Sequence, residues 1–528
     1  MKIGRDILLT VFCLIISVII FRNEISDLGA QNVGDAMLSM DDSAGGAVSG
    51  TDSGFAGFLG ETERGPAAPQ VLTGLADYES IFGGYTGRSY MPYAVKGFFD
   101  NGGKKLYVAR IISNTAESAR MKLKNGKKDA LTINALNGGE WGNRIALRVT
   151  EGKNTTEASP TFRLEIFWFS YKNYTSVKSG KPAPSQADIA EVFDDVAIQD
   201  DSPYFFQNSV NSRSNLIKIS LEEEDAGLLP DQSDKIYWCA GGSDGDAPVL
   251  SDFMDGVGLD GNSAAGLNAF GKVDDISTLY SPLSFMTDGL DKALIAQCEA
   301  LQDRTVIFDT AFGDFRPDPW STHESSFAAC YTPWVQVTGF DSKDVMIPPG
   351  GYIAGIYAEN DPAKGLKKAP GYDVITGVNE VERDLSEQEQ EALTIRKINP
   401  IISISDTEYA VYGAYTLSDM LHQYKNINLR RYVNYLFDTF SNKLDWIAGQ
   451  EWSNELQKQI KIGIENFLDV EWRKGVLAGS SQIEAYYVKV EQQNVAQSGS
   501  QKSTIVMEVG VALLEPSEYF VFKIIKYK

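Results

Sequence analysis

The chain has 528 residues, 43% of them hydrophobic, and a formal net charge of −23. At about 150 residues per domain, this length predicts three or four domains, and the apolar content is too high for a disordered chain. A surface this acidic repels a phosphate backbone, so we expect no nucleic-acid partner.

The N-terminus carries an apolar run, ILLTVFCLIISVIIF, at residues 7–21, flanked by Lys2, Arg5 and Arg22. As a helix it would reach about 22 Å, against roughly 30 Å of hydrocarbon, so it is short for a membrane span but suits the core of a signal peptide. Three interpretations stay open: a membrane signal or anchor, a terminal arm that packs on a neighbouring copy, and a start site assigned upstream of the true one. With a Gly/Ser/Asp-rich linker, this segment makes residues 1–53 the first predicted region.

The next regions alternate between strand and helix patterns. Residues 54–112 have a β-α-β pattern, with strands predicted at 55–60 and 106–112 and helices around 78–82 and 91–101. Residues 113–226 are rich in strands and predict an inserted, mostly-β domain. Residues 227–377 return to α/β, with strands at 235–240, 276–280 and 305–310 and a helix at 290–302.

The last region, residues 378–528, is strongly helical before it ends in strands. Apolar residues recur at steps of three and four in two stripes, which predict two helices with buried faces: Val433, Leu436, Phe437, Phe440, Leu444 and Ile447, then Leu456, Ile460, Ile464, Phe467 and Leu468. The second helix also carries Lys458, Lys461, Arg473 and Lys474. Together with the preceding regions, this predicts a multidomain chain of the α/β (α+β) class.

The chain end is predicted to be two apolar strands separated by Glu515-Pro516. The first strand alternates with period two, through Ile505, Met507, Val509, Val511 and Leu513. The second strand, YFVFKII at 519–525, includes Tyr519, Val521 and Phe522. An unpaired apolar strand invites aggregation, so these strands must pair in their own sheet or extend a neighbour's sheet.

One catalytic pattern requires a test. Residues 241–245, GGSDG, match the GxSxG motif of serine hydrolases and follow a predicted strand. Ser243, Asp309 and His422 would stand in the chain order of a triad. No apolar helix starts directly after Gly245, however, and no oxyanion loop is evident, so we favour a tight turn. A serine hydrolase stays an alternative.

The sequence contains no complete metal-binding or cofactor-binding motif that we could identify. The chain has two histidines, and His323-Glu324 begins an HExxH motif in which Phe327 holds the second histidine position. The four cysteines lie far apart in the sequence and are expected to be free thiols: Cys13, Cys239, Cys298 and Cys330. We therefore expect no metal site and no cofactor.

An ordered set of segments resembles the sheath protein of contractile phage tails and related injection systems. The set includes GFAGFLGETERGP at 54–66, LTINALNGGEWGNRIALRV at 131–149, GGSDG at 241–245 and, most specifically, IPPGGYIAGIYAENDPAKGLKKAPG at 347–371. It continues through NFLDVEWRKGVLAGSS and VGVALLEPSEYFVFKI to the C-terminus. Residues 1–50 depart from the family, because they lack its PGVY-like turn and carry the apolar run instead.

The resemblance implies a structural protomer that is not an enzyme. It implies a discontinuous core domain built from the segment after Gly54 and the C-terminal region, with the α/β and mostly-β domains inserted between. The terminal strands would add to sheets of neighbouring copies, which stack as six-fold rings around an inner tube. The sheath would contract and drive the tube through a target membrane.

The resemblance also implies partners and a location. The partners are further copies of the chain, the inner tube protein, and baseplate and tail terminator proteins. Assembly would occur in the cytoplasm, and the product would be a virion tail or injection particle. Lys458, Lys461, Arg473 and Lys474 are candidates to face an acidic tube, and a solvent-exposed helix face is the alternative. A membrane-anchored surface protein stays a further alternative, because of residues 7–21.

Overall fold

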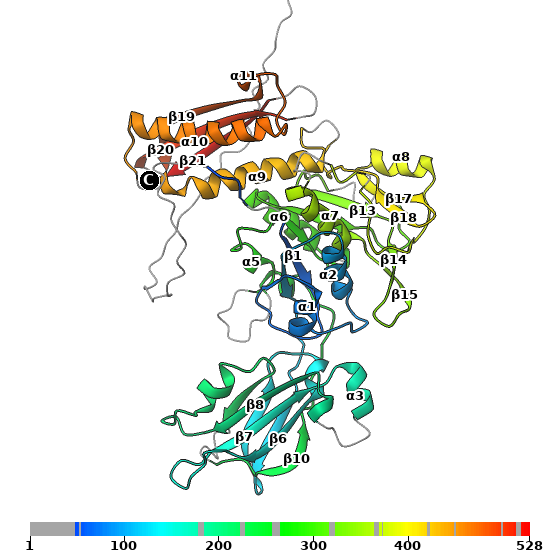
Figure 1. The fold of residues 1–528 in the computed structure, drawn as a ribbon, viewed down its shortest axis with the longest axis vertical. Helices are drawn as coiled ribbons and strands as arrows, with labels where there is room; N and C mark the ends of the chain where they lie inside the picture. The colour runs from blue at the N-terminus through cyan, green and yellow to red at the C-terminus, as the bar shows by residue number, and fades with distance from the viewer. Residues whose placement is uncertain are drawn as a thin grey trace, which may run out of the picture. The chain divides into compact units, whose positions relative to one another are not determined.

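The computed structural model describes most of the chain, in two compact units (Figure 1). The larger unit includes the described residues from 54 to 430, and the smaller one includes the described residues from 431 onward together with residues 48–51. The described residues are 48–51, 54–177, 184–221, 228–255, 265–282, 284–315, 323–363, 369–371, 373–419, 423–447, 450–497, 500–513 and 519–527. The apolar run at 7–21 lies outside them.

An eight-stranded sheet forms the centre of the larger unit. Its six inner strands pair in parallel and its two edge strands are antiparallel. Strands β1, β12 and β13 are buried along their whole length, as expected for parallel strands covered on both faces. The order is β18 (Glu408–Val411), β17 (Ile398–Ser405), β13 (Ala328–Thr332), β12 (Thr305–Asp309), β11 (Thr278–Tyr280), β1 (Ala56–Gly60), β3 (Leu106–Arg110) and β2 (Gln70–Leu72).

Helices cover both faces of this sheet and define two apolar cores. One core includes α1 (Leu75–Phe82), α2 (Met91–Asp100) and α7 (Gly350–Ala363); the other includes α4 (Leu250–Met254), α5 (Gly266–Phe270), α6 (Leu290–Leu301) and α8 (Glu387–Ile395). Helices α2 and α7 pack so closely that a Cβ on Gly351 would lie 2.5 Å from the Ala94 Cα. The glycines of the IPPGGYIAG segment therefore permit this helix contact. A small sheet joins β15 (Asp344–Ile347), β14 (Val335–Thr338) and β16 (Glu380–Val381).

The inserted domain is a pair of antiparallel sheets around a main apolar core, and a smaller apolar cluster includes Phe167, Phe169 and Val177. A short helix, α3 (Tyr171–Val177), follows the third strand of the first sheet. The first sheet is β10 (Ser233–Trp238), β6 (Ile145–Glu151), β7 (Phe162–Trp168) and β8 (Ile189–Val196), and the second is β4 (Arg120–Asn125), β5 (Lys128–Ala135) and β9 (Ile217–Leu221).

Two pairings differ from the division of the chain expected from sequence. Strand β10 pairs with β6, so the inserted domain extends past residue 226; an isolated strand pattern cannot reveal its partner. Strand β1 pairs with both β11 and β3, so residues 54–112 share a sheet with residues 278–411. The last hundred residues contribute no strand to that sheet among the described segments.

The smaller unit combines helices with a three-stranded antiparallel sheet. Helix α9 (Ile427–Lys443) enters it from the larger unit, and α10 (Asn454–Arg473) and α11 (Gln482–Ala485) pack beside the sheet. The sheet order is β19 (Tyr486–Gln497), β20 (Ser500–Ala512) and β21 (Tyr519–Tyr527). The second apolar stripe lies on α10, and the first lies on α9 except for Leu444 and Ile447, which follow the end of that helix. All the residues of both stripes are buried, and the expected mixed α/β, multidomain class is confirmed.

A buried carboxylate ties the sheet to the start of α7. Asp309, at the end of β12, accepts hydrogen bonds from the Tyr280 hydroxyl and from the Gly350 N–H, both at 2.7 Å. Burial raises the pKa of Asp309 to about 7, and these two hydrogen bonds oppose the rise. An unfolded aspartate has a pKa near 3.9, so the folded state holds this proton more tightly.

We expect Asp309→Asn to change the pH dependence of stability. Because the folded pKa is raised, the wild-type contribution falls as pH rises from about 4 to 7 and is constant above. The amide cannot ionise, so the stability of the variant relative to wild type should increase between pH 5 and pH 8 in urea unfolding. Asp309→Ala, the control, cannot ionise either and should show the same pH trend relative to wild type, but it should be less stable than Asp309→Asn at every pH, by roughly 1–3 kcal/mol for each donor left unpaired. An Asp309→Asn difference independent of pH would contradict the assignment.

Candidate functional site

The C-terminal strands form a sheet within the chain. Strand β20 pairs along its length with β19 on one side and β21 on the other, so both its edges are occupied. The side chains of Ile505, Met507, Val509, Val511 and Leu513 are all buried. In this structure, residues 505–513 are therefore the centre of a sheet, and their use as an arm stays a prediction.

Strand β21 differs, because among the described residues it pairs with β20 alone and leaves its other edge without a strand. The backbone register places Tyr519 opposite Ala512, Val521 opposite Gly510 and Phe522 opposite Val509. Of the two predicted arms, β21 is thus the one that lies at a sheet edge and the chain end together.

Helix α10 does not present an unbalanced row of cations. Its Ser453 N-cap accepts from the Leu456 N–H at 3.0 Å, and Ile460, Ile464 and Leu468 are buried. Three of the four cations considered as tube contacts pair with acids of the same helix: Lys461 with Glu465 at 3.7 Å, Arg473 with Asp469 at 2.6 Å and Lys474 with Glu471 at 2.8 Å. Lys458 is exposed. A tube-facing role for these residues stays a prediction.

The proposed hydrolase residues are not arranged as a triad. Both carboxylate oxygens of Asp309 are occupied in the core by Tyr280 and Gly350. The Ser243 hydroxyl accepts from the Gly245 N–H at 3.1 Å, and the next helix begins seven residues later, at Leu250. A nucleophile elbow needs a helix directly after the serine. His422 lies outside the described residues.

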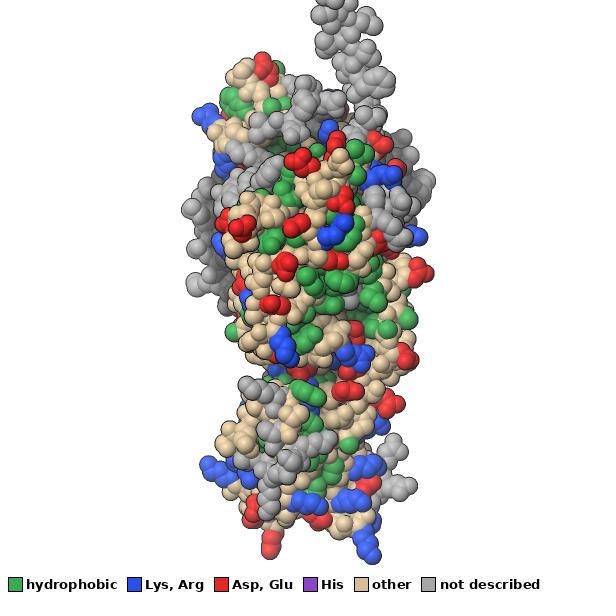
Figure 2. Space-filling model, turned by 90° about the vertical axis from the view of Figure 1, so that its right-hand side faces the viewer, with side chains coloured by type: hydrophobic (Ala, Val, Ile, Leu, Met, Phe, Trp, Pro, Cys, Tyr) green, Lys and Arg blue, Asp and Glu red, His purple; other side chains and the backbone are tan. Residues whose placement is uncertain are grey.

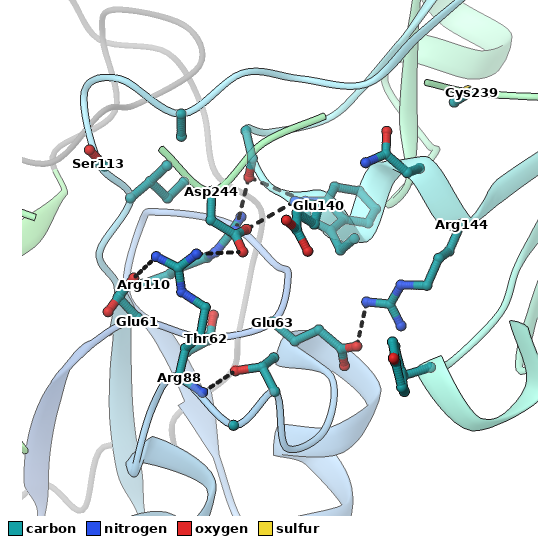
Figure 3. Close-up of a pocket in the computed structure, with 18 of the residues that line it drawn as sticks. Glu61, Thr62, Glu63, Arg88, Arg110, Ser113, Glu140, Arg144, Cys239 and Asp244 are labelled. Atoms are coloured by element: carbon teal, nitrogen blue, oxygen red, sulfur yellow. Dashed lines mark hydrogen bonds and ion pairs between the residues drawn. The ribbon is translucent and has the colours of Figure 1, made fainter. Parts of the chain in front are cut away.

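Charged side chains instead gather in a cleft where the inserted domain joins the central sheet (Figure 3). The cleft encloses about 980 Å³. Its floor follows the carboxyl ends of the parallel strands β1 and β3, and its roof comes from residues 138–144 and 238–244 of the inserted domain. The carboxyl edge of such a sheet is where α/β proteins place their sites.

Ion pairs cross this cleft. The Glu63 carboxylate meets the Arg144 guanidinium at 2.5 Å, and their side chains are only 6% and 9% exposed. Arg88 lies between Glu61, at 4.0 Å, and Asp244, at 3.3 Å, as Figure 3 shows. Burial raises the pKa of Glu61 and lowers that of Arg110 to about 10.

A basic hairpin is the surface feature that our sequence analysis missed. Residues 120–128 hold Arg120, Lys122, Lys124, Lys127 and Lys128, all exposed, and Lys and Arg side chains are prominent at the lower end of the face in Figure 2. In β4, cations alternate with apolar residues along the strand, and this alternation could have revealed the basic hairpin from the sequence. Lys122 and Lys124 both pair with Asp129, at 3.0 Å and 3.7 Å.

Metal sites, cysteines and membrane-spanning helices can be assessed only in the segments that the structure describes. Within those segments, no group of His, Cys, Asp or Glu side chains could hold a metal ion. Cys239, Cys298 and Cys330 are buried free thiols, and Cys13 lies outside the described part of the chain. No helix among the described residues is long and apolar enough to cross a membrane.

Comparison with known structures identifies the fold as that of contractile sheath proteins. The sheath tail protein of Desulfitobacterium hafniense aligns over 95% of this chain and 100% of its own, with a TM-score of 0.56 and 13% identity. The sheath tail protein of Listeria innocua gives a TM-score of 0.61 at 12% identity, over 90% of this chain and 96% of its own.

Sheaths of injection systems are similar as well. The helical sheath of the anti-feeding prophage, in its contracted state, aligns over 94% of this chain and 99% of its own, with a TM-score of 0.51 and 18% identity. The expectation of a sheath fold is thereby confirmed. No protein-family model and no curated protein sequence matches the chain.

Proposed function

We propose that this chain is the protomer of a contractile sheath. The observation that carries the proposal is the extent of the structural match, which includes nearly the whole length of both chains for sheath proteins of two bacteria. The similar proteins are structural, and Asp309 and Ser243 of the alternative triad form other contacts here. A structural role therefore fits better than hydrolysis.

In this proposal, copies of the chain stack as six-fold rings around an inner tube, bounded by baseplate and terminator proteins. Baseplates of the anti-feeding prophage contain chains with this fold, and one is described as six-fold symmetrised. The particle would be assembled in the cytoplasm. Contraction would release energy stored at assembly and drive the tube through a target membrane.

The strands that link neighbouring copies would be β20 and β21. Main-chain hydrogen bonds between β20 and β21 are the same whether both strands come from one chain or from two. We propose that β21 pairs with its own β20 in the free protomer and with the β20 of a neighbour in the sheath. Such links would stay paired while the domains they connect shift during contraction.

Electron microscopy tests assembly directly. Purified full-length protein, alone or with its tube protein, should form rings or cylinders, whereas a variant that ends at residue 518 should stay monomeric because it lacks the linking strand. Circular dichroism of the truncated variant checks that it is folded. Full-length protein that stays strictly monomeric at high concentration, even with the tube, would overturn the sheath proposal.

A disulfide in the β20–β21 register distinguishes strand exchange from closed pairing. Glu508 and Lys523 are directly opposite, and cross-strand Cα separations of about 4.5–5.5 Å permit a disulfide. Glu508→Cys with Lys523→Cys should therefore oxidise within one chain in the monomer and between chains in the cylinders, where denaturing gels should show a ladder. Glu508→Cys with Lys526→Cys, which is out of register, is the control. Intrachain bonds alone in cylinders would refute exchange.

The hydrolase alternative has its own test. An active-site serine probe should leave the protein unlabelled, because Ser243 lies in a glycine turn where its hydroxyl accepts a hydrogen bond from the Gly245 N–H. Stoichiometric labelling that Ser243→Ala abolishes would restore the hydrolase.

A further inference from the structure

The joint between the inserted domain and the central sheet is polar. The apolar cores on the two faces of the central sheet share no residue with the cores of the inserted domain. A small apolar cluster lies near the joint and includes Ala67, Ile112 and Ala265, with Ala116 packed against it. Polar interfaces between domains generally permit relative motion.

Two antiparallel segments of chain connect the domains. Glu117 and Ser243 exchange backbone hydrogen bonds of 2.9 Å and 3.0 Å, and Arg120 and Ala240 do the same at 2.8 Å and 3.0 Å. The GGSDG segment forms the return strand of this ribbon. Gly245 has a positive φ of 73°, and a Cβ there would lie 2.5 Å from the Thr115 Oγ1, so close contact of the two segments explains this glycine.

One buried ion pair holds the joint closed. Arg144 donates to Glu63 and also to the Phe169 carbonyl, at 3.3 Å, and its guanidinium lies 5.1 Å from the Trp168 ring. The second Glu63 oxygen accepts from the Gly84 N–H at 2.6 Å. Glu63 therefore ties Arg144 of the inserted domain to a loop of the central-sheet domain.

Weaker contacts surround this pair. The Gly65 carbonyl accepts from Asn137 at 2.9 Å and from Arg110 at 3.1 Å, and Arg110 also donates to the Gly138 carbonyl at 3.0 Å. The more exposed Arg88–Asp244 pair lies at the mouth of the cleft. All of these contacts are polar and can be exchanged for water if the cleft widens.

We infer that the joint is a hinge with an electrostatic latch, in which the Glu63–Arg144 pair controls how often the inserted domain separates from the central sheet. The two connecting segments act as the hinge. A polar joint can reopen without exposing an apolar core, unlike the helix contacts within the sheet domain. The inference does not depend on assembly, although in a sheath it would let the inserted domain adapt as neighbours move.

Hydrogen exchange of the monomer tests the latch. Glu63→Gln keeps an acceptor for Gly84 but removes the charge facing Arg144, so amide exchange in residues 137–144 and 240–246 should accelerate by about tenfold or more. Exchange in β12, residues 305–309, should be unchanged and serves as the internal check on global stability. Equal acceleration of both regions, or of neither, would overturn the latch.

Glu165→Gln is the matched control. Glu165 is 9% exposed and pairs with Arg148 and Arg163 within the inserted domain, so its loss should accelerate exchange in β7 and leave the 240–246 segment unchanged. A second measurement uses Arg88→Cys with Asp244→Cys in the Glu63→Gln background. A short bismaleimide bridge between these positions should restore slow exchange in residues 137–144, and failure to do so would show that exchange there does not pass through opening of the cleft.

The monomer experiment separates this inference from the sheath proposal. Cylinders with a static joint would leave the sheath proposal intact and remove the hinge. A protein that never assembles but whose joint responds to Glu63→Gln would leave the hinge intact and remove the sheath proposal.

Discussion

Parallel pairing of β1 with both β3 and β11 is the constraint on which the larger unit depends. Strands β1 and β11 lie more than two hundred residues apart, yet they pair over Ala56–Thr278, Gly57–Leu279 and Phe58–Tyr280. This pairing brings the ends of the inserted domain together, because β3 carries the chain out and β11 follows its return. The charged cleft lies at the carboxyl ends of β1 and β3, the edge of the sheet where the chain leaves for the inserted domain.

Local patterns predicted many elements and few partners. The period-three-and-four stripes of α9 and α10 and the alternation of β20 are set by neighbours in sequence, which is why they could be identified. Strand β10 was recognised as a strand but assigned to the wrong domain, because the β6 strand with which it pairs lies some ninety residues earlier. The resemblance to sheath proteins supplied the fold that periodicity alone could not.

Charge was the least predictable property of the candidate sites. The lysines and arginines of α10 suggest a basic face in the sequence, but the acids three and four residues away neutralise three of them. Conversely, Glu63 and Arg144 are eighty-one residues apart and carry no sequence signal of their pairing. The net charge of the chain and its local runs of charged residues therefore predict neither the charge of the α10 surface nor the ion pair at the joint. Both depend on which side chains the fold places together.

The C-terminal strands raise a related question, because the exchange of β21 between copies that we propose would depend on protein concentration. Six residues of sequence, 513–518, separate β20 from β21, and so short a tether gives an effective concentration in the millimolar range for pairing within one chain. A free neighbour at micromolar concentration cannot compete with that tether, since the main-chain hydrogen bonds are equivalent. In the proposed sheath, exchange would become favourable where assembly holds neighbouring copies in contact and adds side-chain contacts to the strand pairing. A strand that closes on itself in solution and opens onto a neighbour in a lattice would keep protomers soluble until assembly begins.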